Sequence, residues 1–201
     1  MTELVYRALF VIIFALFWIV RLNYVRKTRD PESPRSRAER RTAMKQEGWT
    51  GILIVVLTPI ELILILIFLW GPPWMAWADL VYPFWLYWIG AALLLCSIPL
   101  MAWVHRTLGQ HYSYALETKA VHSLVTTGPY SRVRHPLYSV HNLFNLGMVF
   151  LTANIPLIVF ALIGVPITYA RMRDEERMMI EKFGSDYESY MERTGRIFPK
   201  L

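Results

Sequence analysis

The chain has 201 residues, of which 55% are hydrophobic and 18% are charged, and its formal net charge is +6. So large an apolar fraction beside 21 lysines and arginines is unusual for a soluble domain of this size. The single cysteine, Cys96, excludes both a disulfide and a thiolate metal site within one chain. The composition therefore favours a membrane protein whose apolar segments and basic loops are separated along the sequence.

Three long apolar segments occupy the first half of the chain. Residues 4–20, 52–70 and 81–104 contain only two charges, Arg7 and Glu61. Segments of this length match a hydrocarbon core about 30 Å thick when they are helical. A signal peptide at the N-terminus would need a basic stretch before residue 4 and a small-residue cleavage site after residue 20, and neither is present. We therefore predict three spanning helices.

A fourth apolar region, residues 137–170, is long enough for two helices. It is interrupted by Asn154 and Pro156, which favour a helical hairpin over one long helix. The sequence thus predicts an all-α integral membrane protein with about five transmembrane helices, of which the last two form the hairpin. Residues 1–201 are expected to form one transmembrane domain.

Basic residues are distributed unevenly between the predicted loops. Residues 21–45 contain nine lysines and arginines, whereas residues 71–80 contain none. Since cytoplasmic loops carry an excess of lysine and arginine, we predict an N-terminus outside and a cytoplasmic C-terminus. The positive charge is then a signature of membrane topology, and it requires no nucleic acid as a partner.

Aromatic residues gather around the predicted outer loop, at Trp70, Trp74, Trp77, Tyr82, Trp85, Tyr87 and Trp88. Tryptophan and tyrosine are enriched where membrane and water meet. We interpret them as anchors at the interface and not as a cofactor site.

The first of two polar segments that flank the predicted hairpin is residues 122–138. Within it, Gly128 and Pro129 indicate a turn that lets the backbone approach a ligand. Pro136 suits the first turn of the next helix, whose free N–H groups would attract a carboxylate or phosphate. Arg134 and His135 could add charged hydrogen bonds. In the alternative interpretation, Arg134 lies at the lipid headgroups and His135 caps the helix.

The second polar segment begins at Arg171. Arg171 and Glu175 are four residues apart and share one helical face, where they could hold an anionic and a cationic or hydroxylated ligand group together. The alternative is a surface salt bridge, which contributes little to stability. Asp174, Glu176 and Arg177 are expected to point elsewhere, as solvated charges.

These residues form a longer pattern. It reads His122-x-Leu124-Val125-x-x-Gly128-x-Tyr130-x-x-x-Arg134-His135-Pro136-x-Tyr138, then a hairpin, then Arg171-x-x-x-Glu175-Glu176, Phe183-Gly184-x-x-Tyr187-x-x-Tyr190 and Phe198-Pro199. The pattern resembles the isoprenylcysteine carboxyl methyltransferase family, one of a wider group of membrane methyltransferases that includes phospholipid N-methyltransferases. The resemblance covers roughly the C-terminal half, and the N-terminal helices match only in being hydrophobic.

The resemblance implies an enzyme that uses S-adenosyl-L-methionine, with a cofactor-binding part at about residues 105–201 on the cytoplasmic side. Its implied cofactor-binding residues are His122, Ser123, Leu124, Val125, Tyr130, Arg134, His135, Pro136, Leu137 and Glu175. It also implies that Arg171 is the catalytic residue that faces the substrate carboxylate. Ser139-Val140 stands where many members have a glycine, and Ala115 falls where some eukaryotic members place a glutamine ligand, so the substrate class stays open.

The expected reaction is methyl transfer to a membrane-borne lipidic acceptor, first of all the carboxylate of an isoprenylcysteine-like substrate. A carboxylate is already ionised at neutral pH and needs no general base, whereas an amine would need one, with Glu175 or His135 as the candidate. The alternatives are a phospholipid N-methyltransferase and an NADPH-dependent sterol-type reductase, since such reductases share the Gly-x-Tyr and Arg-His-Pro-x-Tyr segments. A non-enzymatic scaffold would leave the polar segments unexplained.

No metal is expected, because His105, His111 and His122 have no acidic or thiol partner at ligand spacing.

Overall fold

The computed structural model describes residues 3–27, 48–109 and 123–200. Five long helices make up most of these ranges: α1 (Glu3–Lys27), α3 (Gly48–Trp70), α4 (Phe84–Leu108), α5 (Pro136–Thr152) and α6 (Ile155–Phe183). A short helix, α7 (Ser185–Arg193), and two 3₁₀ helices, η1 (Pro73–Ala78) and η3 (Gly128–Ser131), complete the described part. No strand forms in these ranges, so the predicted all-α class is confirmed.

Four of the helices, α1, α3, α4 and α6, are long and apolar enough to cross a membrane. The fifth, α5, has 17 residues and would extend over roughly 26 Å. It falls just below the usual length of a spanning helix. The spans expected at residues 4–20, 52–70 and 81–104 are therefore present as helices, while the count of five spans stays a prediction.

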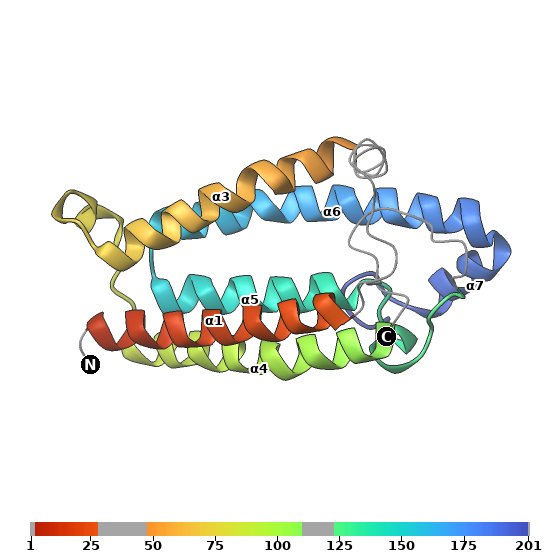
Figure 1. The fold of residues 1–201 in the computed structure, drawn as a ribbon, viewed down its shortest axis with the longest axis horizontal. Helices are drawn as coiled ribbons and strands as arrows, with labels where there is room; N and C mark the ends of the chain where they lie inside the picture. The colour runs from red at the N-terminus through yellow and green to blue at the C-terminus, as the bar shows by residue number, and fades with distance from the viewer. Residues whose placement is uncertain (1–2, 28–47, 110–122, 201) are drawn as a thin grey trace.

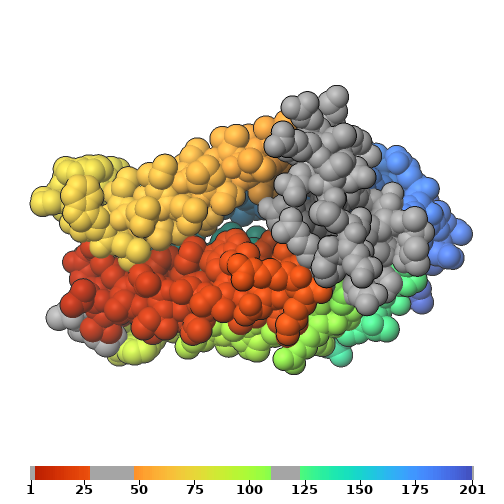
Figure 2. Space-filling model, in the orientation of Figure 1, coloured from red at the N-terminus to blue at the C-terminus, as the bar shows by residue number. Residues whose placement is uncertain are grey.

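The helices form two layers (Figure 1), and in the space-filling view α1 (red) and α3 (orange) form the lower and upper parts of the visible face (Figure 2). α1, α4 and α5 lie side by side in one layer, and α3 and α6 run together in the other. The core lies between the helices of the first layer, where Phe17 of α1 stacks on Phe144 of α5 with ring centroids 4.1 Å apart. Leu94, Met101 and Met148 are fully buried beside them.

The outward surface of the bundle is apolar. Large side chains such as Ile52, Leu66 and Leu162 are more than half exposed. A water-soluble protein rarely presents so much contiguous apolar area, whereas a lipid-facing surface requires it.

The turn between α5 and α6 confirms the predicted hairpin. Ala153 ends α5 in a left-handed conformation with φ 47°, and α6 begins directly after Asn154. Pro156 therefore lies in the first turn of α6, where its missing N–H breaks no helical hydrogen bond.

α6 continues well beyond its apolar part. Its 29 residues extend to Phe183 and carry Arg171 and Glu175 past the apolar stretch. Beyond α7 the chain returns along residues 132–135, where the Arg134 amide donates to the Gly195 carbonyl at 2.8 Å and the His135 amide to the Arg196 carbonyl at 3.0 Å. The end of α6, the start of α5 and the C-terminal segment thus meet at one end of the bundle (Figure 1).

Candidate active site

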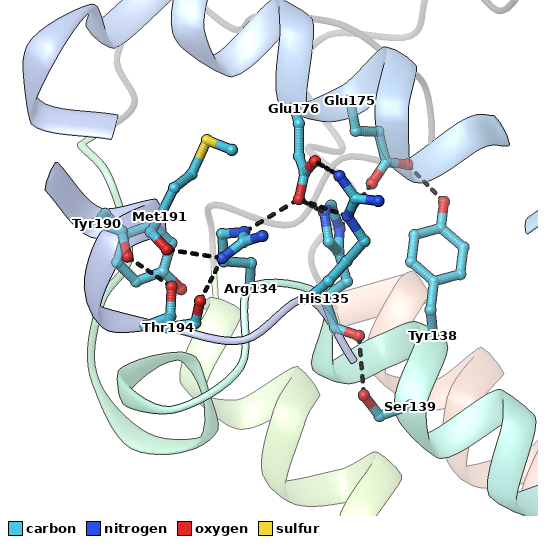
Figure 3. Close-up of polar contacts among 10 residues, drawn as sticks. Arg134, His135, Tyr138, Ser139, Glu175, Glu176, Tyr190, Met191 and Thr194 are labelled. Atoms are coloured by element: carbon cyan, nitrogen blue, oxygen red, sulfur yellow. Dashed lines mark hydrogen bonds and ion pairs between the residues drawn. The ribbon is translucent and has the colours of Figure 1, made fainter. Parts of the chain in front are cut away.

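Charged and hydroxylated side chains from three parts of the chain converge at this end (Figure 3). The start of α5 provides His135 and Tyr138, and α6 provides Glu175 and Glu176. Arg134 lies just before α5 and bonds to Glu176 of α6, to the Met191 carbonyl of α7 and to the Thr194 carbonyl directly after α7.

Arg171 and Glu175 are joined through a tyrosine. The Tyr138 hydroxyl donates to Glu175 Oε1 at 2.5 Å and accepts from Arg171 Nε at 3.1 Å. Arg171 Nε lies 3.5 Å from the same Glu175 oxygen. The predicted shared face is confirmed. The ion pair of the alternative interpretation is present, but the Arg171 side chain is only 8% exposed, so it is not a surface pair.

His135 lies between two carboxylates. Its Nδ1 is 3.4 Å from Glu175 Oε2 and its Nε2 is 3.3 Å from Glu176 Oε1. Burial by itself would lower the pKa of His135, but the hydrogen bonds and charges of Glu175 and Glu176 outweigh it and raise the pKa above the usual value. The arrangement favours an imidazolium that donates from both nitrogens. His135 is the N-cap residue of α5, as the alternative expected, but its side chain makes no capping bond and faces the two carboxylates instead.

Glu176 corrects the sequence-based expectation of a solvated charge. It is 4% exposed and accepts hydrogen bonds from Arg134 Nε at 3.0 Å and Arg196 Nε at 3.1 Å. A second Arg196 nitrogen, Nη2, also pairs with it. Local spacing could not show this burial, because residues 134 and 196 reach Glu176 only through the fold. Its neighbours Asp174 and Arg177 lie 3.8 Å apart with more exposed side chains, which agrees with the expectation of solvated charges.

Arg134 is directed toward protein acceptors. Besides Glu176, it donates from Nη1 to the carbonyls of Met191, at 3.0 Å, and Thr194. Its side chain is 9% exposed, so the alternative of a lipid-headgroup contact is wrong. These bonds fasten the C-terminal segment to the start of α5, and a direct contact of Arg134 with a cofactor stays a prediction.

The remaining predicted cofactor residues lie on both sides of η3. Tyr130 is buried in η3, and its carbonyl accepts from the Tyr190 hydroxyl at 2.6 Å. Ser123 is exposed, Leu124 and Val125 are half-buried before η3, and Pro136 and Leu137 form the first turn of α5. His122 lies outside the described residues.

Three residues of the candidate site have no role in the expectations from the sequence: Tyr138, Glu176 and Arg196. Tyr138 belongs to the motif, and its position three residues after His135 is the signal that could indicate a role. The burial of Glu176 contradicts the expectation from the sequence, and nothing in the sequence indicates Arg196, since its partner is 20 residues away in the chain.

Comparisons with known proteins indicate which family this chain resembles. Residues 88–181 match the model of the isoprenylcysteine carboxyl methyltransferase (ICMT) family. The chain is related to the ICMT family. The matched range includes α5 and the site residues of α6, and it ends before Arg196.

Among relatives, the nickel-cobalt-cadmium resistance protein NccN of Alcaligenes xylosoxydans xylosoxydans is 31% identical over 57% of this chain and 53% of its own length. The protein-S-isoprenylcysteine O-methyltransferase of Saccharomyces cerevisiae is 31% identical over 50% of this chain and 45% of its own. The chain thus spans about half the length of the curated relatives it matches.

A solved structure shows a related fold. The eukaryotic intramembrane Ras methyltransferase ICMT matches with a TM-score of 0.52 and 28% identity, over 57% of this chain and 42% of that one. Together with the four apolar helices, this match identifies a multi-pass integral membrane protein.

Proposed function

We propose that this chain transfers a methyl group from S-adenosyl-L-methionine to a lipidic acceptor in the membrane, with the carboxylate of an isoprenylcysteine-like substrate as the first choice. The proposal rests on the hydrogen-bonded unit in which Tyr138 of α5 joins the buried Arg171 and the partly exposed Glu175 at the end of the apolar part of α6. The names of the yeast relatives, protein-S-isoprenylcysteine O-methyltransferases, support the reaction class.

The polar groups of the site suit such a cofactor. S-adenosylmethionine carries a carboxylate, an ammonium group and ribose hydroxyls, and when bound it supplies an electrophilic methyl group. The Glu175 side chain is 26% exposed and can accept from ammonium or hydroxyl groups. The His135 imidazolium, whose two nitrogens face Glu175 and Glu176, holds the Glu175 carboxylate in position for such contacts. Residues 123–125 and Tyr130 are expected to complete the cofactor site.

Arg171 would orient the acceptor. A guanidinium binds a carboxylate through two parallel hydrogen bonds and fixes its direction. Alignment of the reacting atoms can lower an activation barrier by about 7–11 kcal/mol. A carboxylate that is fixed by Arg171 can therefore attack the methyl group without a general base. Arg171 lies beside the apolar stretch of α6, where a lipid-anchored head group would arrive from the bilayer.

The protonation of His135 favours a carboxylate acceptor over an amine. An amine acceptor must lose a proton, and an imidazolium between two carboxylates cannot receive it. Glu175 would be the remaining base, but it already accepts the Tyr138 hydroxyl. A carboxylate acceptor requires no base.

Calorimetric titration with S-adenosylhomocysteine and with NADPH tests the cofactor class. We expect saturable binding of S-adenosylhomocysteine and none of NADPH, and the reverse result would favour the reductase alternative. Methyl transfer to a farnesylated cysteine with a free carboxylate, compared with its carboxamide and with an aminophospholipid, then tests the acceptor. Methylation of the aminophospholipid alone would overturn the carboxylate assignment.

A further inference from the structure

A cavity with charged residues in its lining lies at the opposite end of the bundle from the candidate active site. It measures about 380 Å³ and is bordered by the first turns of α1, the end of α3, the start of α4 and the end of α5. In Figure 1 this is the end at which η1 and the N-terminus lie. Its charged lining residues are Glu3, Arg7 and Asp79.

Arg7 is built into the wall of this cavity. Its side chain is 16% exposed, its guanidinium lies 5.1 Å from the centre of the Phe68 ring, and Nη1 donates to the Leu69 carbonyl at 3.4 Å. A Cβ atom at Gly71 would lie 2.0 Å from Arg7 Nη1. The guanidinium therefore packs directly against the backbone at Gly71, whose φ of 61° itself favours glycine.

Asp79 is held in place from the other side. Its Oδ1 accepts from Asn154 Nδ2, in the turn between α5 and α6, at 2.8 Å. Its Oδ2 lies 3.6 Å from Arg7 Nη2, which is beyond good hydrogen-bond distance. This oxygen is thus oriented toward the cavity while it keeps room for a further donor.

The charges that line the cavity are not balanced. Two carboxylates, Glu3 and Asp79, face one guanidinium. Glu3 pairs with Arg7, but its side chain is 70% exposed, so water screens this pair and it contributes little. Because the pair is exposed, Glu3 can give up the guanidinium to an anionic group of a ligand and, with Asp79, accept hydrogen bonds from a cationic group.

Aromatic side chains place the cavity at the level of lipid headgroups. Tyr6 and Tyr87 stack in its wall with centroids 4.2 Å apart, and the Tyr87 hydroxyl donates to the Leu80 carbonyl at 3.3 Å. Around this end, large indole rings are about half or more exposed, at Trp70, Trp74, Trp77, Trp85 and Trp88. Exposed tryptophans of this kind mark the interface of a membrane.

We infer that this cavity binds the headgroup of a phospholipid that carries both a phosphate and a primary ammonium, that is, phosphoethanolamine. Arg7 binds the phosphate, and Asp79 and Glu3 accept hydrogen bonds from the ammonium. A choline headgroup has no N–H to donate, and a glycerol headgroup brings no cation, so both bind less well. The site is independent of methyl transfer at the other end.

Lipid retention by the full chain, purified in detergent and measured by native mass spectrometry, tests the inference. We expect phosphatidylethanolamine to be retained at least threefold more than phosphatidylcholine or phosphatidylglycerol of the same acyl chains. Equal retention of the three lipids would overturn the inference. If the protein bound soluble phosphoethanolamine but did not retain the lipid, the ligand of the cavity would be the free compound and not a lipid headgroup.

Two variants and a control assign the effect to the cavity. Asp79→Asn removes the charge but keeps an oxygen that can accept from Asn154, and Glu3→Gln changes an exposed side chain. Each should reduce the retention of phosphatidylethanolamine to the level of phosphatidylcholine, whereas Asp186→Asn, on exposed α7, should not. Wild-type retention in the Glu3→Gln variant, which has no buried contact to lose, would contradict the inference even if Asp79→Asn failed to fold.

Discussion

The Tyr138 hydroxyl bridges the side chains of Arg171 and Glu175. It donates to the carboxylate and accepts from the guanidinium, which keeps Arg171 Nε 3.5 Å from Glu175 Oε1. Without the hydroxyl, the two charges could pair directly. Arg171 would then be less available to a substrate carboxylate.

We therefore expect Tyr138→Phe to raise the KM for a carboxylate acceptor about tenfold or more, since a hydrogen bond to a charged group contributes about 1.5–3 kcal/mol. The affinity for S-adenosylhomocysteine should change by much less. Steady-state kinetics and calorimetry would measure the two effects, with Tyr6→Phe at the far end as the control. An equal loss in both quantities would show that Tyr138 supports the whole site.

Arg171 itself should serve the acceptor more than the cofactor. We expect Arg171→Ala to lower turnover of a carboxylate acceptor far more than it weakens S-adenosylhomocysteine binding. Arg171→Lys should restore little activity, because lysine offers a point charge in place of a planar fork. Near-wild-type turnover in the lysine variant would refute this role.

His135 and Glu175 are expected to belong to the cofactor site. His135→Ala and Glu175→Ala should each abolish binding of S-adenosylhomocysteine while the protein still inserts into the membrane, since neither residue lies within an apolar stretch. Calorimetry on the purified variants, with membrane fractionation as the control, checks both effects. Unchanged affinity in both variants would contradict the assignment.

At the scale of elements, the C-terminal segment is part of the site. Its backbone pairs with residues 132–135, Arg196 bonds to Glu176, and the Ile197 carbonyl accepts from the Ser139 hydroxyl at 2.7 Å. The segment thereby holds Glu176 against His135. A displacement of this segment should reach the cofactor site through that contact.

Gly195 offers a way to displace the segment. A Cβ atom there would lie 1.7 Å from the Phe198 carbonyl oxygen, so Gly195→Ala should force the backbone apart. Such overpacking destabilises by about 1–3 kcal/mol, and the affinity for S-adenosylhomocysteine should fall with it. Gly164→Ala is the matched control, because its Cβ would meet no atom within 4 Å. Thermal unfolding should show a lower stability, and calorimetry a lower affinity for S-adenosylhomocysteine, in Gly195→Ala than in Gly164→Ala. If stability and affinity were the same in both variants, the C-terminal segment would not support the cofactor site.

At the scale of the whole molecule, the two polar ends are separated by the apolar bundle. The basic residues of 21–45 predict that the candidate active site faces the cytoplasm and that η1 lies outside. A cysteine placed at Met75, in a Cys96→Ala background, should react with a membrane-impermeant reagent in whole cells. Labelling only after the membrane is opened from the cytoplasmic side would reverse the topology.

The sequence by itself determined the helices, the hairpin and the Arg171–Glu175 pair. Bilayer thickness sets the length of an apolar segment, Asn154 and Pro156 act locally, and a spacing of four residues places two side chains on one helical face. Tertiary structure alone decided that Glu176 is buried, since Arg134 lies 42 residues from it in the chain and Arg196 lies 20. The same holds for Tyr138, 37 residues from Glu175. The sequence near a charged residue does not show whether the residue is buried, because its partners can be distant in the chain. Only the folded chain brings those partners together.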